Sequence, residues 1–129
     1  CDTATDEAIF KGIKSKADII LCAPCCHKQV RKSMKADPDK NPMLKFGILE
    51  ERQAEILTDT IRALLMNNCG YDTNVFEFIT TDHTPKNLMI SGIKTKKPPG
   101  IAEIDKKLEN LKSQFGIEYH QLEKLLDKK

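Results

Sequence analysis

A short apolar run that ends in a polar cluster is the feature that most constrains the fold of this chain. Residues 17–23 hold Ile19, Ile20 and Leu21 side by side, and Pro24 follows directly. A run this short, bounded by breakers, predicts a strand buried on both faces, which is typical of parallel sheets. The polar residues 24–28 come next, so the sequence predicts an exposed loop at the end of a buried strand.

A second polar segment, residues 1–6, precedes a helical pattern. Thr3 and Asp6 have the spacing of a capping box, which predicts a helix over residues 6–15. Gly12 would let this helix lie close against a sheet. Because strand, helix and parallel strand form a right-handed crossover, we expect a first strand that lies at or before Cys1. The chain is therefore expected to be a piece of a larger protein.

The middle of the chain continues the alternation of helices and strands. A breaker-rich loop at residues 36–45 precedes a long helical pattern over 47–68, which Gly70 ends. Two β-prone runs, at 75–80 and 88–93, flank a turn-forming sequence. We expect them to pair as an antiparallel hairpin, with the first of them parallel to the earlier strands.

The last third of the chain is helical. Apolar residues recur at steps of three and four over 101–115, Gly116 ends that pattern, and a shorter one covers 119–126. We expect residues 1–97 to form the sheet domain and residues 98–129 to form a helical extension packed on it.

The predicted topology brings three polar segments together. Parallel strands joined by helices point their carboxyl ends at one edge of the sheet, and ligands bind at that edge. Residues 1–6, 24–28 and 81–87 each follow such a strand end, whereas the strand at 88–93 runs back from it. The sequence therefore predicts one pocket built from three loops.

Composition fits one domain in a reducing compartment. At 129 residues the chain can bury a modest core, and no apolar run approaches the ~20 residues of a membrane span. Five cysteines, two of them adjacent, make a poor disulfide framework and predict a cytoplasmic protein without membrane contact. A mature lipoprotein also begins with Cys, but free thiols within an apolar strand argue against that alternative.

The charge is nearly balanced overall but uneven along the chain. A net charge of +2 does not by itself indicate nucleic acid. Residues 28–45 are locally basic, with Lys28, Arg31, Lys32, Lys35, Lys40 and Lys45 against Asp37 and Asp39. A phosphate-contacting patch and a solvated loop and helix surface both fit this stretch.

The polar segments resemble a known enzyme family. Cys-Asp-Thr-Ala-Thr-Asp at 1–6, Ala-Pro-Cys-Cys-His-Lys at 23–28 and Asp-His-Thr-Pro-Lys-Asn at 82–87 are similar to the C-terminal half of a class I (Rossmann-like) S-adenosylmethionine-dependent methyltransferase. The group it resembles is related to the methyltransferase domain of glutathione S-transferase C-terminal-domain-containing proteins. The first two motifs are also similar to those of tRNA 2′-O-methyltransferases.

The resemblance implies an α/β fold in which the chain forms the C-terminal half of a Rossmann-like methyltransferase sheet, with parallel strands, an antiparallel hairpin strand and C-terminal helices. Residues 1–97 would be the C-terminal half of the catalytic domain. No G-x-G occurs in the chain, so the glycine-rich turn that cradles the cofactor would belong to an N-terminal half of the same protein. The isolated chain is therefore expected to be inactive.

The resemblance also assigns roles at the predicted edge. Methyl transfer requires an aligned acceptor and, for a hydroxyl or amine, removal of a proton. Asp2 and His27 are the candidate catalytic residues, and Cys1, Asp2 and Thr3 are the candidate contacts of S-adenosyl-L-methionine. The candidate substrate-binding residues are Asp6, Cys25, Cys26, Lys28, His83, Lys86 and Asn87.

Other interpretations of these residues stay open. Asp6 suits a helix cap, and His27 and His83 suit hydrogen-bonded structural roles. Cys25 and Cys26 fit a nucleophile or small buried thiols. Together with Cys22 and His27 they offer atoms for zinc, but no second Cys pair or His pair completes a tetrahedral set, so no metal is predicted.

The function expected from the resemblance is S-adenosylmethionine-dependent methylation of RNA by the full-length protein. The alternative is a non-catalytic module that binds nucleic acid or protein and keeps the methyltransferase-like sheet. The expected partners are RNA and the N-terminal half of the same protein. An exposed sheet edge would also favour self-association of the isolated chain.

Overall fold

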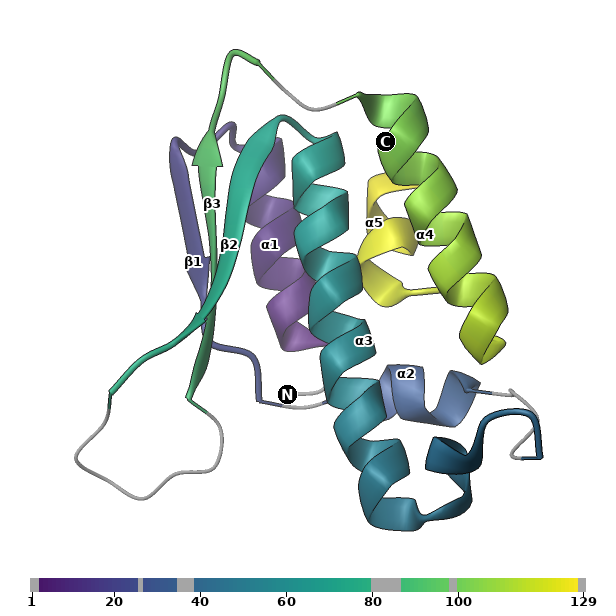
Figure 1. Ribbon diagram of the computed structural model, residues 1–129. Helices are drawn as coiled ribbons and strands as arrows, with labels where there is room; N and C mark the ends of the chain where they lie inside the picture. The colour runs from purple at the N-terminus through teal and green to yellow at the C-terminus, as the bar shows by residue number, and fades with distance from the viewer. Residues whose placement is uncertain (1–2, 26, 35–38, 80–86, 98–99, 128–129) are drawn as a thin grey trace.

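A computed structural model describes residues 3–25, 27–34, 39–79, 87–97 and 100–127. A small sheet lies on one side of the molecule, and the helices are stacked on the other side (Figure 1). In chain order the elements are α1 (Ala4–Lys14), β1 (Ile19–Cys22), α2 (Lys28–Ser33), the 3-10 helix η1 (Pro42–Lys45), α3 (Gly47–Asn68), β2 (Tyr71–Glu77), β3 (Leu88–Lys94), α4 (Ile101–Phe115) and α5 (Gln121–Asp127).

The sheet has the order β1-β3-β2, with β3 in the centre and antiparallel to both neighbours. The predicted α/β class and the antiparallel hairpin are thereby confirmed. Every pairing among the described strands is antiparallel, so the parallel pairing expected of a Rossmann-like sheet is not seen in this part of the chain. Because β1 and β2 each run antiparallel to β3, these two strands nevertheless point in the same direction.

Strand β2 begins earlier than the sequence pattern predicted. The predicted run started at residue 75, whereas the observed strand starts at Tyr71, directly after Gly70 with φ of +91°. Asp72 and Asn74 have low β-propensity, but they are held in the sheet by register with β3, in which Tyr71 lies opposite Lys94. At the other end, the Phe78 N–H donates to the Asn87 carbonyl at 2.8 Å.

One face of the sheet, the bare face, is not covered by the described part of the chain. Helices α1 and α3 cover the face that carries Ile20 and Ile90, and these side chains are buried. On the opposite face Ile19 and Leu21 are each 61% exposed and Ile93 is 56% exposed. The prediction of a strand buried on both faces is therefore wrong for the described structure, because an unbroken apolar run does not show whether both faces have a covering layer.

Helix α1 lies against β1 as Gly12 predicts. A Cβ on Gly12 would lie 3.0 Å from the Cδ1 atom of Ile20, so a larger residue would require the Ile20 side chain to shift. The predicted capping box is wrong. Thr3 occupies the N-cap position without a side-chain hydrogen bond, and the Asp6 carboxylate binds Arg62 instead.

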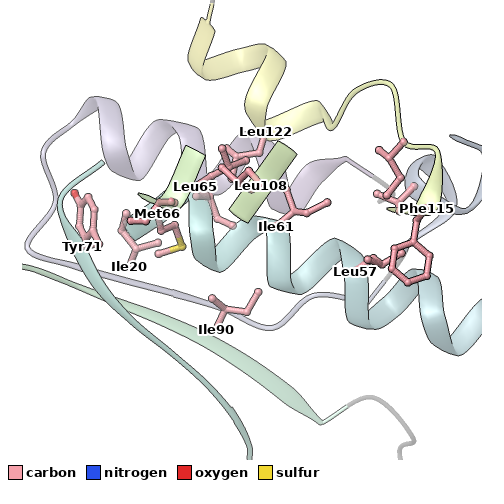
Figure 2. Close-up of a cluster of buried hydrophobic side chains, with 14 residues drawn as sticks. Ile20, Leu57, Ile61, Leu65, Met66, Tyr71, Ile90, Leu108, Phe115 and Leu122 are labelled. Atoms are coloured by element: carbon pink, nitrogen blue, oxygen red, sulfur yellow. The ribbon is translucent and has the colours of Figure 1, made fainter. Parts of the chain in front are cut away.

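The core is centred on α3. Figure 2 shows its buried residues Leu57, Ile61 and Leu65 together with side chains from the sheet and from the C-terminal helices. Helices α4 and α5 pack against α3 and α1, with α5 lying beside α1 (Figure 1). Gly116, with φ of +68°, ends α4 as the sequence predicts. No helix among the described residues combines the length and apolar character needed to cross a membrane.

The two faces of the sheet predict different losses of stability when two isoleucines on β3 are replaced by alanine. Ile90→Ala should lower the free energy of unfolding by about 2–5 kcal/mol, because it leaves a cavity under α3. Ile93→Ala should change it by about 0.5 kcal/mol or less, because that side chain is exposed. Urea denaturation of both variants measures the difference, and similar losses would show that the bare face is covered in solution.

Candidate functional site

A buried guanidinium connects two helices at the centre of the molecule. Arg62 on α3 is 1% exposed and forms a bidentate pair with Asp6 on α1. Its Nε donates to Asp6 Oδ1 at 2.8 Å, and its Nη2 donates to Asp6 Oδ2 at 3.1 Å. Its Nη1 donates to Asp59 Oδ1 at 3.0 Å, one turn earlier on α3. A bidentate, charge-assisted pair of this kind fixes the orientation of the guanidinium relative to the carboxylate.

The Asp59 carboxylate also binds His27, which lies in the loop after β1. His27 is buried, and its Nε2 lies 3.2 Å from Asp59 Oδ2. An ionised carboxylate only accepts hydrogen bonds, so the network assigns the proton to His27 Nε2. The other ring nitrogen, Nδ1, is buried and has no hydrogen-bond partner among the described residues. Nε2 is thus held by Asp59, and Nδ1 is open to a group outside the described structure.

This network joins two of the three predicted loop segments. Asp6 belongs to the segment at residues 1–6 and His27 to the one at 24–28, and both bind side chains of α3. The hairpin lies next to the loop after β1, because Asn87 lines a pocket of about 190 Å³ together with Pro24 and Asp59. Pro24 and Asn87 therefore lie at one pocket, at the end of the sheet where β1 and β2 finish, and Asp6 is connected to this pocket through Arg62 and Asp59.

The described candidate residues occupy different environments in this region. Asp6 is buried in its pair with Arg62, and Cys25 and Lys28 are exposed on either side of His27. Thr3 is half-buried and lines a shallow cleft of about 400 Å³ with α2 and the segment before α5. Asn87 closes the hairpin, since its Nδ2 donates to the Phe78 carbonyl at 3.2 Å.

The remaining candidates are Cys1, Asp2, Cys26, His83 and Lys86, which lie outside the described residues. Among the residues that are described, no group of three His, Cys, Asp or Glu side chains could hold a metal ion.

Sequence reasoning missed Asp59 and Arg62. Both lie on the face of α3 that carries Leu57, Ile61 and Leu65, and all five side chains are buried. The available signal was a pair of charges three residues apart within an apolar stripe, since charged residues are rarely buried unless they are paired. The spacing of residues along α3 does not show that Asp6 on α1 is the partner of Arg62.

Burial and the network determine which nearby groups carry charge. Burial disfavours the charged form of Arg62, but its hydrogen bonds to Asp6 and Asp59 outweigh that effect and raise its pKa above the ordinary value. Burial also raises the pKa of the Cys22 thiol to about 11, with Arg62 opposing the shift. Cys22 is therefore a protonated thiol at neutral pH and a poor nucleophile.

A second buried histidine lies beside the network. His120 precedes α5 and is fully buried, and its Nδ1 accepts a hydrogen bond from the Leu122 N–H at 3.2 Å. Burial lowers the pKa of His120 to about 4, and the nearby Asp6 carboxylate only partly offsets that. The ring is neutral at physiological pH, so His120 acts as part of the core.

Comparisons with known proteins address the same segments. Residues 1–33, which include α1, β1 and α2, match a family model described as a methyltransferase domain. The chain is also similar to the glutathione S-transferase C-terminal domain-containing proteins of Macaca fascicularis and Homo sapiens, at 26% identity over 117 residues in each case. Each match covers 72% of this chain and 18% of the relative, so the chain spans less than a fifth of these relatives. No solved structure matches the chain.

The family match supports a methyltransferase domain, and the matched residues 1–33 contain Asp6 and His27 of the Arg62 network.

Removal of Arg62 should be costly. Arg62→Met leaves the buried Asp6 and Asp59 carboxylates without their counter-charge, so the free energy of unfolding should fall by about 3–5 kcal/mol. Arg52→Met on the same helix is the control, because Arg52 is exposed and its loss should cost about 0.5 kcal/mol or less. Urea denaturation compares the two variants, and equal losses would contradict a structural role for the buried pair.

His120 should make stability depend on pH. The unfolded imidazole takes up a proton below about pH 6.5, whereas the folded one stays neutral until about pH 4. The unfolded state therefore binds more protons in this window, and falling pH should remove about 3 kcal/mol of stability through this group. His120→Gln should flatten the slope of unfolding free energy between pH 6.5 and 4. An unchanged slope would show that His120 can be protonated in the folded protein.

Proposed function

We propose that this chain forms the acceptor side of a class I, Rossmann-like S-adenosylmethionine-dependent methyltransferase, as the C-terminal half of its catalytic domain, and that the full-length protein methylates RNA. The observation that carries the proposal is the methyltransferase-domain match over residues 1–33, which contain both Asp6 and His27 of the buried network. The described pocket at the ends of β1 and β2 supports the placement of the acceptor at this edge.

The residues present fit one half of such a site. The buried, unpartnered Nδ1 of His27 requires a hydrogen-bond donor, and an acceptor hydroxyl or amine is one. S-adenosyl-L-methionine, when bound, supplies a methyl group activated by a sulfonium. The chain has no G-x-G turn for the nucleotide part of this cofactor, so its own proposed cofactor contacts are limited to Cys1, Asp2 and Thr3.

In this proposal the chain aligns the acceptor and removes its proton. His27 Nδ1 takes the proton that a hydroxyl or amine must lose, and Asp2 orients the same group. Asp6 is bound to Arg62, so we assign it a positioning role through that pair. The other proposed substrate contacts are Cys25, Cys26, Lys28, His83, Lys86 and Asn87.

The surface charge near His27 supports an RNA substrate. Lys28 and Lys32 on α2 and Lys40 and Lys45 beyond it are exposed, so each can contact a phosphate. Arg31 is engaged by Glu50 and Glu51 and contributes less to this patch. Four exposed lysines on α2 and the segment that follows it are consistent with a polyanionic acceptor.

The bare sheet face supports an intramolecular partner. Ile19, Leu21 and Ile93 are exposed together, and β1 pairs on one side only among the described strands. We propose that the N-terminal half of the same protein covers this face and continues the sheet beyond β1. In the isolated chain the same face would favour self-association, because exposed apolar strands pair with other copies. The odd number of cysteines, five with two of them adjacent, supports a cytoplasmic location.

The test of this function uses the full-length protein, S-adenosylmethionine labelled in its methyl group, and total cellular RNA. Wild-type protein should transfer label to RNA, and Asp2→Ala should lower turnover by about 100-fold or more while changing the free energy of unfolding by about 0.5 kcal/mol or less. Asp18→Ala is the control, because Asp18 is exposed at the opposite end of β1.

Two outcomes would contradict the proposal. Equal losses of turnover and stability in Asp2→Ala would reassign Asp2 to a structural role. Wild-type protein that binds RNA and cofactor but transfers no label would favour the non-catalytic binding module.

A further inference from the structure

The two nitrogens of the His27 ring have unequal environments. Nε2 lies 3.2 Å from Asp59 Oδ2, whereas Nδ1 is buried without a partner among the described residues. Buried polar atoms are nearly always hydrogen-bonded, because an unpaired one forfeits its hydration. The unpaired Nδ1 is therefore open to a hydrogen-bonding group from outside the described structure.

Asp59 is held so that it cannot turn away from His27. Its Oδ1 accepts from Arg62 Nη1 at 3.0 Å, and Arg62 is anchored in turn by two hydrogen bonds to Asp6. The carboxylate is thus fixed at both oxygens, one by a cation and one by the imidazole. Since neither oxygen can donate, His27 must carry its proton on Nε2.

We infer that Asp59 is a positioning residue, which fixes His27 in the Nε2–H form and thereby presents Nδ1 as the hydrogen-bond acceptor. The inference rests on the proposed function, because in that function Nδ1 receives the proton of the methyl acceptor. The role given to Asp59 rests on the hydrogen-bond geometry alone, so it can be tested without methyl transfer.

The substitution Asp59→Asn makes a sharp prediction about the tautomer. Arg62 has only donors, so the Asn carbonyl oxygen must take the position of Oδ1 and face the guanidinium. The Asn amide then replaces Oδ2 and donates to His27 Nε2, which must give up its proton. The proton moves to Nδ1, and Nδ1 ceases to be an acceptor. An Asp→Asn change behind a catalytic histidine acts through the same tautomer exchange in serine proteases.

Nitrogen-15 NMR of the histidine rings tests the inference on this chain at about pH 8, where an ordinary imidazole is neutral. Wild-type His27 should show a protonated Nε2 and an unprotonated Nδ1, and Asp59→Asn should exchange the two. His120 is the internal control, because its Nδ1 accepts from the Leu122 N–H and its tautomer should be the same in both proteins. His27→Gln and His120→Gln assign the signals.

Three results would overturn the inference. They are a wild-type His27 protonated on Nδ1 alone, a wild-type His27 protonated on both nitrogens, and a folded Asp59→Asn chain whose His27 pattern is unchanged. If Asp59→Asn does not fold, the wild-type tautomer together with Asp59→Glu decides the matter, because Glu keeps an acceptor and should keep the proton on Nε2.

The full-length protein provides a second readout. With labelled S-adenosylmethionine and total cellular RNA, Asp59→Asn should lower kcat by about 100-fold with little change in KM for RNA, and Asp59→Glu should recover part of that loss. A rise in KM alone would show that Asp59 acts on binding and would overturn the positioning role. Absence of transfer by wild-type protein would contradict the proposed function, while the NMR result would still decide the role of Asp59.

Discussion

The Arg62 guanidinium is the interaction on which the rest of this structure depends. It is buried between Asp6 and Asp59, and a buried charge is tolerated only when its partners are well placed. That requirement fixes the start of α1 against the middle of α3 and, through Asp59, fixes the loop that carries His27. One side chain thus aligns two segments that lie far apart in the sequence.

The architecture around this pair is one-sided. Helices α1 and α3 cover one sheet face, and α4 and α5 pack behind them (Figure 1). The other face exposes Ile19, Leu21 and Ile93. The site that we propose lies at the end where β1 and β2 finish, because the pocket and the buried network both lie there. Asp59 on α3, itself held by Arg62, can keep His27 in one orientation at this edge.

Several elements followed from local sequence alone. The helix over 47–68 was predicted with its observed bounds, because apolar residues recur at helical spacing along these 22 residues and Gly70 then ends the pattern. The contact of Gly12 with β1 was likewise predicted. The early start of β2 at Tyr71 was not, because residues 72–74 take their conformation from pairing with β3.

The sequence by itself determined the α/β alternation, the hairpin and the candidate loops, since these depend on periodicity and breakers within a few residues. Tertiary structure alone decided that only one sheet face is covered, that Asp6 pairs with Arg62 and not with its own helix start, and that Asp59 holds His27. The physical reason is the same in each case. A side chain's burial and its hydrogen-bond partner depend on segments tens of residues away, and no local spacing records which segment arrives there.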